Sequence, residues 1–352
     1  MSAIEKTLLI LTPGFPASED DTTCIPAQQT FVRTLKRCNP TLNIIVVAFQ
    51  YPFRFDDYDF HSVRVISLNG GNKRRLNKLL TWLNAWRIVT RINSEHNVIG
   101  VLSFWLGECA LVGKYFARKY NLKQFTWLLG QDAKQGNPYY SIVQPTSHSL
   151  IALSDFVVAE FYKNYRVTPQ HIIPVGIDTS MFVNNELIRD IDILGAGSLI
   201  PLKRYDLFIE IIKDLSGDIP LGICIIVGKG PEKKKLQTKI HDSGLQEIVK
   251  LFDELPHTDV LRLMERSKIF LHTSSYEGYG AVCSEALYAG AHVVSFCKPM
   301  DEDFTHEYFV RSKEEAISKI KQILTDTRRE HHRVLAYSAE SVAEQVMKLF
   351  IK

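Results

Sequence analysis

One stretch of the sequence combines carboxylates, glycines and a helix start at a spacing that suits the binding of a phosphorylated sugar. Glu277 is followed by Gly278 and Gly280, and Glu285 lies inside the apolar run that begins near Ala281. Glycines let a backbone approach a ligand closely, and a helix start offers N–H groups and a positive dipole end to a diphosphate. Carboxylates accept hydrogen bonds from sugar hydroxyls. A helix cap with two solvated glutamates explains the same residues, so spacing alone leaves both interpretations open.

A second turn places cations after an apolar strand. Residues 195–206 read Gly-Ala-Gly-Ser-Leu-Ile-Pro-Leu-Lys-Arg-Tyr-Asp, so Lys203 and Arg204 stand just before a predicted helix. Either cation is able to neutralise phosphate oxygens, and arginine does so with two parallel bonds. Taken alone, the segment is better explained as an ordinary strand-to-helix loop with a solvated Lys-Arg pair. Gly195 and Gly197 lack the third glycine of a dinucleotide fingerprint, so they are weak evidence for NAD binding.

Three shorter turns also follow predicted strands. Gly228 stands near Pro231, and a proline at the start of a helix is a common structural device. Gly14 follows the first strand, where it either lets a loop pass close to a ligand or forms a plain turn. Asp132 follows the strand at Phe125–Leu129 and is a candidate for orienting a sugar hydroxyl.

The scaffold that must position these residues is an alternation of strand-like and helical runs, which predicts parallel sheets wound with helices. The 352 residues favour two domains, separated by the polar stretch Asn184–Asp190. Two such domains facing each other form a cleft at the carboxyl ends of their strands, where ligands bind in this architecture. The predicted strands are Thr7–Leu11, Ile44–Phe49, Val98–Ser103, Phe125–Leu129, Ile151–Leu153, His171–Pro174, Ile191–Gly195, Leu221–Val227, Val249–Phe252, Ile269–His272 and His292–Phe296. The predicted helices are Pro26–Cys38, Lys73–Glu95, Glu108–Tyr120, Glu160–Tyr165, Tyr205–Leu215, Glu232–Ser243, Thr258–Arg266, Ala281–Ala289 and an amphipathic helix within Arg329–Phe350.

The composition is that of an ordinary globular protein, with 45% hydrophobic and 23% charged residues. No run of about 18 apolar residues predicts a membrane-spanning helix, and the start does not resemble a signal peptide, so we expect a cytoplasmic protein. Six scattered cysteines indicate reduced thiols rather than disulfides or a zinc site. The acidic clusters Glu19–Asp21 and Asp56–Asp59 lack supporting histidines and are interpreted as solvated loops, so no metal site is predicted.

Charge is distributed unevenly along the chain. Residues 1–170 hold 19 Lys and Arg against 12 Asp and Glu, whereas the remainder holds 23 against 27. The segment Lys73–Arg91 contains six cations and no acid, together with Trp82 and Trp86, which is typical of a helix lying on an anionic membrane surface. The alternative is a domain helix with buried leucines and solvated cations. Nucleic acid is not an expected partner, because the basic character is confined to one helix. The leucines of this helix are Leu76, Leu79, Leu80 and Leu83.

These motifs, taken together and in this order, resemble those of glycosyltransferase family 4, a retaining family with the GT-B fold. The resemblance is strongest over Asp192–Phe296, which contains the Lys203 turn, the turn 228–231, the two glutamates with seven residues between them and Ala286–Val294. Pro174–Asp178 resembles the segment that closes the first domain of the family. The fold implied is α/β, with two Rossmann-like doubly wound domains facing an interdomain cleft.

The same resemblance implies a division of labour along the chain. Residues 1–186 are expected to form an acceptor-binding domain, and residues 187–330 a domain that binds the nucleotide-sugar. Tyr337 and Ser338 resemble the family's tail, so residues 331–352 are expected to form a terminal helix that returns to the first domain.

Residue roles follow from the resemblance as well. Lys203 is expected to neutralise the donor diphosphate, Glu277 to meet the transferred sugar and Glu285 to hold the ribose. The family works without a bound metal and stabilises the departing diphosphate with cations and helix dipoles. The expected donor is a UDP- or GDP-sugar, no cofactor is permanently bound, and the acceptor is a saccharide or a lipid-linked molecule. The expected catalytic residues are Glu277, Lys203 and Asp132, and the expected donor-binding residues are Gly14, Gly197, Ser198, Lys203, Arg204, Gly228, Leu255, Glu277, Gly278, Tyr279, Gly280, Ala281, Val282 and Glu285.

Three positions depart from the family pattern. Ser198 replaces the usual arginine of the glycine turn, with Arg204 as a candidate substitute, and Leu129 replaces a histidine that contacts sugar in the family. The segment after Phe296 is shortened to Cys297–Asp301. These departures allow a sugar-nucleotide-binding protein without transfer activity, and the fold also allows a nucleotide-sugar epimerase or a phosphorylase. The leading hypothesis is a cytoplasmic glycosyltransferase for cell-surface polysaccharide, lipopolysaccharide or glycolipid, and attachment to the inner face of the membrane stays open beside it.

Overall fold

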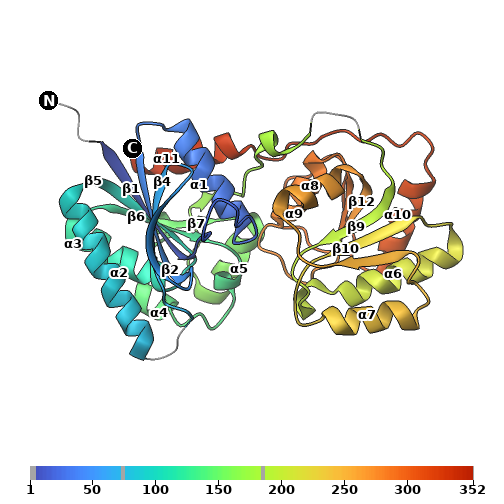
Figure 1. Ribbon diagram of the computed structural model, residues 1–352, viewed down its shortest axis with the longest axis horizontal. Coiled ribbons are helices and arrows are strands. Elements are labelled where there is room, and N and C mark those ends of the chain that lie inside the picture. The colour runs from blue at the N-terminus through green and yellow to red at the C-terminus, as the bar shows by residue number, and fades with distance from the viewer. Residues whose placement is uncertain (1–4, 73–75, 184–186, 352) are drawn as a thin grey trace. The chain divides into compact units, whose positions relative to one another are not determined.

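The structure is a computed structural model, and it describes residues 5–72, 76–183 and 187–351. The chain forms two compact α/β units (Figure 1). Unit 1 comprises Met1–Gly176 and Ala339–Lys352, and unit 2 comprises Ile177–Ser338. The chain therefore passes into unit 2 near Gly176, rather than near residue 186, and returns near Ser338. Both crossing segments are tied together, because the Ile177 N–H donates to the Tyr337 carbonyl at 2.8 Å.

The sheet of unit 1 has the strand order β3-β4-β2-β1-β5-β6-β7-β8 in the described residues. Every neighbouring pair is parallel except β3 and β4. The central strand β1 is apolar and buried on both faces from Leu8 to Leu11, as expected of a parallel strand covered by helices. The strands are β1 (Lys6–Gly14), β2 (Asn43–Tyr51), β3 (Phe55–Phe60), β4 (Val63–Leu68), β5 (Asn97–Phe104), β6 (Lys123–Leu128), β7 (Leu150–Ala152) and β8 (His171–Ile172).

Helices cover both faces of this sheet. Helices α2 and α3 pack on one face, where Phe116 joins the buried core. On the other face, Phe31 of α1 packs edge-on against Trp127, with ring centroids 4.9 Å apart. The terminal helix α11 also belongs to unit 1, where Phe350 meets Phe125 at 5.2 Å. The helices are α1 (Pro26–Cys38), α2 (Leu76–Glu95), α3 (Glu108–Tyr120), α4 (Tyr140–Val143), α5 (Asp155–Tyr165) and α11 (Ala339–Ile351), with 3-10 turns η1 (Gln131–Ala133) and η2 (Ser147–Ser149).

The sheet of unit 2 is parallel throughout, with the strand order β11-β10-β9-β12-β13-β14. Helices α6, α7 and α10 pack on one face around Phe208, and α8 and α9 pack on the other around Phe270 (Figure 1). The strands are β9 (Ile191–Ala196), β10 (Ile223–Val227), β11 (Val249–Phe252), β12 (Ser267–His272), β13 (His292–Ser295) and β14 (Glu307–Phe309). The helices are α6 (Tyr205–Asp218), α7 (Lys233–Asp242), α8 (His257–Glu265), α9 (Ala281–Tyr288) and α10 (Lys313–Thr325), with 3-10 turns η3 (Thr179–Met181) and η4 (Pro201–Lys203).

Some sequence-based expectations about elements are wrong. The acidic cluster Asp56–Asp59 lies in strand β3 rather than in a loop, because it pairs with β4 and Asp57 forms a two-pronged ion pair with Arg64 at 2.7 and 2.9 Å. The terminal helix starts only at Ala339. Strands β3, β4 and β14 and helix α10 were not predicted, whereas α1 and α3 have the predicted bounds.

Candidate functional site

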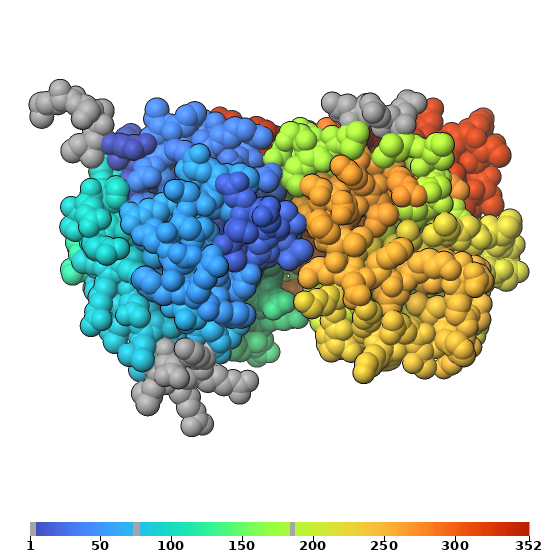
Figure 2. Space-filling model, in the orientation of Figure 1, coloured from blue at the N-terminus to red at the C-terminus, as the bar shows by residue number. Residues whose placement is uncertain are grey.

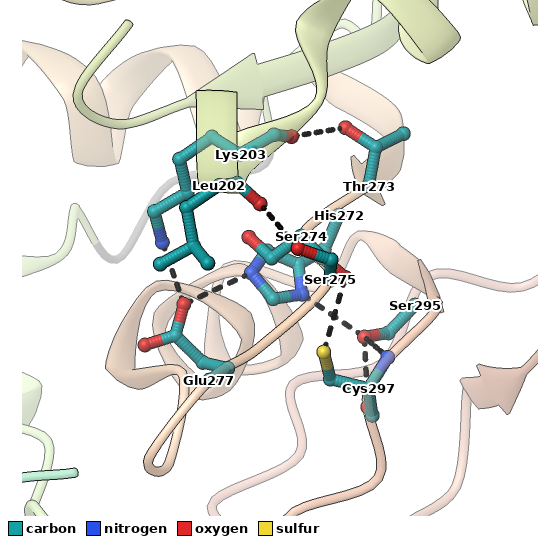
Figure 3. Close-up of polar contacts among 9 residues, drawn as sticks. All are labelled: Leu202, Lys203, His272, Thr273, Ser274, Ser275, Glu277, Ser295 and Cys297. Atoms are coloured by element: carbon teal, nitrogen blue, oxygen red, sulfur yellow. Dashed lines mark hydrogen bonds and ion pairs between the residues drawn. The ribbon is translucent and has the colours of Figure 1, made fainter. Parts of the chain in front are cut away.

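Two strand-end turns meet at the carboxyl edge of the sheet in unit 2. One turn follows β9 and carries Lys203, and the other follows the neighbouring strand β12 and carries Glu277 (Figure 3). The Ser275 N–H donates to the Leu202 carbonyl at 3.0 Å, and the Thr273 hydroxyl donates to the Lys203 carbonyl at 2.7 Å. These two hydrogen bonds fix the turns against each other, at the end of the sheet where ligands of parallel α/β folds bind.

Lys203 and Glu277 form an ion pair within this site. The Lys203 Nζ lies 2.6 Å from the Glu277 Oε2, and the two side chains are 19% and 22% exposed. Burial acts to raise the pKa of Glu277, but the nearby His272 and the charge of Lys203 outweigh it and lower the pKa to about 2. Glu277 is therefore a carboxylate at neutral pH. The structure thus brings together the two residues that the sequence places 74 positions apart.

The local backbone explains how Lys203 reaches this position. Pro201 starts the short turn η4, and Arg204 then adopts a left-handed conformation with φ 51° before α6 begins at Tyr205. The Arg204 guanidinium lies over the Phe296 ring at 5.8 Å. Ser198 is exposed in the same turn. The cation paired with Glu277 is therefore Lys203, and Arg204 has a different neighbour.

Glycines allow the turns of unit 2 to pack closely. A Cβ atom on Gly228 would lie 1.9 Å from the Gly197 carbonyl oxygen, so no side chain fits there. Gly280 has φ 77° and is the residue before α9, which starts at Ala281. The first amides of α9, which follows the turn that contains Glu277 and Gly278, offer a site for a negatively charged group. The Tyr279 side chain is buried and accepts a hydrogen bond from Ser284 at 2.9 Å, so only its backbone is suited to ligand contact.

The second carboxylate has a partner that sequence reasoning missed. Glu285 lies in α9, and its Oε1 is 2.8 Å from Nε2 of His257, the first residue of α8. Both side chains are less than a fifth exposed. Leu255, just before α8, is half-buried against the apolar core. The approach of α8 to α9 that joins His257 to Glu285 depends on tertiary packing, and no local pattern in the sequence indicates it.

His272 is the other residue that sequence reasoning missed. It ends β12 and is only 5% exposed, with its Nε2 3.4 Å from the Glu277 Oε2. Its Nδ1 lies 3.0 Å from the Ser295 hydroxyl on the adjacent strand β13 (Figure 3). The signal available in the sequence was a histidine at the end of an apolar strand, five residues before Glu277.

Two predicted site residues belong to unit 1. A Cβ on Gly14 would lie 3.4 Å from the Cβ of Tyr51, which is an ordinary contact, so packing alone does not require this glycine. Asp132 is 7% exposed and accepts hydrogen bonds from the backbone N–H groups of Leu106, Leu129 and Gly130 at 2.8–3.0 Å. Burial raises its pKa to about 6 despite these bonds. The carboxylate thus holds two strand-end loops together. Its catalytic role stays a prediction. A cleft shared by both units also stays a prediction.

The helix α2, predicted at Lys73–Glu95, agrees only in part with the pattern of a membrane-surface helix. Leu79, Leu80 and Leu83 of α2 are 47–58% exposed, and α2 forms part of the surface of unit 1 (Figure 2). The tryptophans are not at the surface in the way the membrane pattern requires: Trp82 donates to Glu108 at 2.8 Å, and both Trp82 and Trp86 pack on the core. Lys73, Arg74 and Arg75 lie outside the described residues. Within 5–72, 76–183 and 187–351, no helix has the length and hydropathy to cross a bilayer, and no three potential metal ligands cluster.

Comparison with known proteins identifies the family. The model of the glycosyl transferases group 1 family matches residues 177–342, which include both turns and both glutamates. Residues 177–342 of the chain belong to the glycosyl transferases group 1 family. This assignment agrees with the family 4 resemblance of the sequence motifs. Membership thus rests on unit 2 and the start of α11.

Relatives and solved structures add the overall fold. The GtfA subunit of the UDP-N-acetylglucosamine–peptide N-acetylglucosaminyltransferase of Streptococcus gordonii is 26% identical over 35% of this chain and 24% of its own length. The matches to the first three relatives span only 24–28% of those proteins. Sucrose-phosphate synthase from Thermosynechococcus elongatus has a TM-score of 0.70 at 15% identity, covering 98% of this chain and 95% of its own. An S. aureus TarM mutant in complex with fondaparinux, alpha-GlcNAc-glycerol and UDP has a TM-score of 0.72 at 13% identity, covering 98% and 100%. Together with the two parallel sheets, these likenesses confirm the GT-B fold.

Proposed function

We propose that this protein is a retaining glycosyltransferase that moves a sugar from a nucleotide-sugar to a saccharide or lipid-linked acceptor. The observation that carries the proposal is the pairing of Lys203 with Glu277 beside the start of α9. A cation, a helix N-terminus and a carboxylate at one sheet edge are the groups needed to bind a diphosphate and its attached sugar. Family membership supports the same assignment.

Each group has a definite task in this proposal. Lys203 and the first amides of α9 stabilise the charge that develops on the departing diphosphate, which is where electrostatic stabilisation contributes most. Glu277 accepts hydrogen bonds from the hydroxyls of the transferred sugar, and Glu285, fixed by His257, accepts those of the ribose. The acceptor hydroxyl attacks the anomeric carbon from the face that the diphosphate leaves. The bond from that carbon to the phosphate oxygen breaks, and a phosphate oxygen takes the hydroxyl proton.

The first test is a thermal-shift screen against UDP-, GDP-, ADP- and dTDP-sugars, since a ligand that binds the folded state raises its melting temperature. We expect a UDP- or GDP-sugar to stabilise the protein; the UDP bound to TarM makes UDP the first choice. Glu285→Ala and Lys203→Met should each weaken nucleotide binding about tenfold or more. Lys233→Met, which removes a partly exposed lysine paired with Asp253 elsewhere in unit 2, is the control and should bind normally. Absence of any shift would contradict the proposal.

The alternatives are a sugar-nucleotide-binding protein without transfer activity and a nucleotide-sugar epimerase. Ser198 and Leu129, two of the three departures from the family pattern, are the features that allow the binding protein, whereas the fold alone allows the epimerase. Incubation with the stabilising nucleotide-sugar distinguishes all three, because only a transferase forms a glycosylated acceptor together with free nucleoside diphosphate. Binding without turnover on a panel of lipid-linked and oligosaccharide acceptors would favour the binding protein, and a changed sugar on an intact nucleotide would favour the epimerase.

We further propose that α2 rests on an anionic membrane surface, which would give access to a lipid-linked acceptor. The support is the exposed leucines Leu79, Leu80 and Leu83 beside the exposed cations Arg87 and Arg91. Replacing the three leucines with serine should reduce co-sedimentation with phosphatidylserine-containing vesicles about tenfold. The control replaces Phe53 and Phe55, which are also exposed in unit 1, and should sediment like the unmodified protein. Equal sedimentation of all variants would contradict a role for α2.

A further inference from the structure

His272 is a buried polar side chain with a polar neighbour on each side of its ring. It lies at the end of β12, between Glu277 in the following turn and Ser295 at the end of β13 (Figure 3). The Ser295 oxygen accepts a hydrogen bond from the Cys297 N–H at 3.1 Å, and its hydroxyl is placed to donate to the Cys297 carbonyl at 2.9 Å. The serine that touches the imidazole is therefore itself fixed by the backbone. Such support is typical of a side chain whose orientation matters.

The position of the imidazole proton follows from these neighbours. Burial lowers the pKa of His272, so the ring is neutral at pH 7 and carries one proton. If that proton were on Nδ1, the bare Nε2 would face the Glu277 carboxylate, and two acceptors would oppose each other in a buried place. With the proton on Nε2, the ring donates toward Glu277. The Ser295 hydroxyl then turns its single proton from the Cys297 carbonyl to Nδ1, 3.0 Å away, so no two acceptors oppose each other at the carboxylate. The geometry therefore favours the Nε2–H tautomer.

The contact between His272 and Glu277 is long enough to shorten when a ligand binds. At 3.4 Å from Glu277 Oε2, the buried Nε2 makes no hydrogen bond of good geometry with any described residue. Catalytic hydrogen bonds are often long before substrate binds and shorten in the complex. Oε2 is thus flanked by Lys203 and His272, whereas the described residues donate no hydrogen bond to Oε1. Oε1 is the oxygen left for a ligand.

We propose that His272 is a positioning residue that holds Glu277 through Oε2, so that Oε1 faces the transferred sugar while Lys203 turns its charge to the diphosphate. This inference rests on the proposed function. It explains why the site places two donors beside one carboxylate oxygen. A diphosphate draws Lys203 away from Glu277, and a carboxylate with no second partner would then be free to rotate. His272 carries no net charge and does not compete for the phosphate.

The experiment compares His272→Leu, which removes the donor at similar size, with His272→Gln, whose amide nitrogen is able to replace Nε2. We expect His272→Leu to lower kcat about 10- to 100-fold with donor KM changed less than about threefold. His272→Gln should recover at least a third of the lost activity on a logarithmic scale. His292→Leu is the matched control, because His292 is equally buried on β13 yet bonded to Tyr308 and Glu330. It should lower stability and leave kcat within about twofold.

A second measurement separates this inference from the proposed function. Imidazole nitrogen NMR on the wild-type protein, with no donor added, should show His272 as the Nε2–H tautomer, and Glu277→Gln should shift its Nε2 resonance. A protonated Nδ1 with a bare Nε2 would overturn the inference, as would full turnover by His272→Leu or equal losses in His272→Leu and His272→Gln. If no nucleotide-sugar binds the wild type, the proposed function fails, and the NMR result alone decides the role of His272.

Discussion

Glu277 keeps its charge because of two neighbours, and this gives a prediction about acid. Its pKa in the folded protein is about 2, below the value of about 4.3 expected for an unfolded chain. A carboxyl whose folded pKa is lowered stabilises the protein above the unfolded value and loses that contribution as pH falls through the folded value. Relative to Glu277→Gln, the wild type should be more stable by about 1–3 kcal/mol at pH 7.

Melting temperatures of the two proteins from pH 7 to pH 2.5 would check this prediction. The difference should be constant above about pH 5 and should shrink steadily below about pH 4.3. A difference that does not depend on pH would mean that Lys203 and His272 do not stabilise the ionised form.

Asp132 offers a test that separates a structural role from a catalytic one. Asp132→Ala leaves three backbone N–H groups without their acceptor and should destabilise unit 1 by about 2–4 kcal/mol. That loss corresponds to a fall in melting temperature of about 5–10 °C. Asp132→Asn keeps one acceptor oxygen and should lose less. If Asp132→Ala abolished transfer while melting normally, the residue would be catalytic after all.

For single residues, the sequence indicated which residue types could act in the site, but not which residues they contact. Lys203 and Glu277 were predictable as neighbours because the ends of adjacent parallel strands lie at one edge. His257 and His272 were missed because their roles depend on which helix or strand packs beside them. A membrane surface stayed open as one of two interpretations for Trp82 because the sequence does not reveal Glu108, the buried acceptor of its N–H.

Among the secondary-structure elements, the glycine-rich turns of unit 2 are the most sharply constrained. Gly228→Ala would drive a methyl group to within 1.9 Å of the Gly197 oxygen, so the two turns must separate. We expect Gly228→Ala to lower the melting temperature by several degrees and to weaken nucleotide binding about tenfold, because the turn that carries Lys203 shifts with Gly197.

The matched control for this prediction is Gly217→Ala in α6. A methyl group there meets no atom within 4 Å, and alanine favours a helix by about 0.5–1 kcal/mol over glycine. Gly217→Ala should therefore melt at the same temperature or slightly higher and bind nucleotide normally. Equal binding by both variants would show that the spacing of the turns does not affect the ligand.

Element prediction succeeded where burial on both faces made strands continuously apolar, and where helices had clear ends. It failed for β3, a half-exposed edge strand, because three aspartates among its six residues are typical of a loop. The burial pattern of that strand alternates between exposed and intermediate before Phe60, and Arg64 neutralises one of its acids. Charged residues on an edge strand prevent the strand from pairing with other chains, and the same residues make its sequence resemble that of a loop.

For the whole molecule, the terminal helix gives the clearest prediction. Phe350 is 6% exposed and fills the space over Gly100, where a Cβ would lie 2.5 Å from its ring. Phe350→Ala should destabilise unit 1 by about 3–5 kcal/mol, as expected for truncating a buried phenylalanine. Calorimetry should show the melting of unit 1 lowered and that of unit 2 unchanged. Ile351→Ala, at a neighbouring exposed residue, should change neither.

The number of domains followed from length and pattern, but their limits did not. The polar stretch at 184–190 looks like a linker in the sequence, yet the structure divides the chain earlier, between Gly176 and Ile177. The hydrogen bond from the Ile177 N–H to the Tyr337 carbonyl ties the two ends of unit 2 together, and it joins residues 160 positions apart. No local signal in either segment encodes such a long-range contact.

That contact has a practical consequence for protein engineering. Ile177 and Ser338 pair as a parallel bridge, so unit 2 begins and ends at one point of its surface. Insertions whose termini adjoin are those that a host domain tolerates best. Residues 177–338 should therefore be exchangeable as one segment. Replacing them with the corresponding segment of a relative should transfer that relative's donor preference to an otherwise unchanged protein.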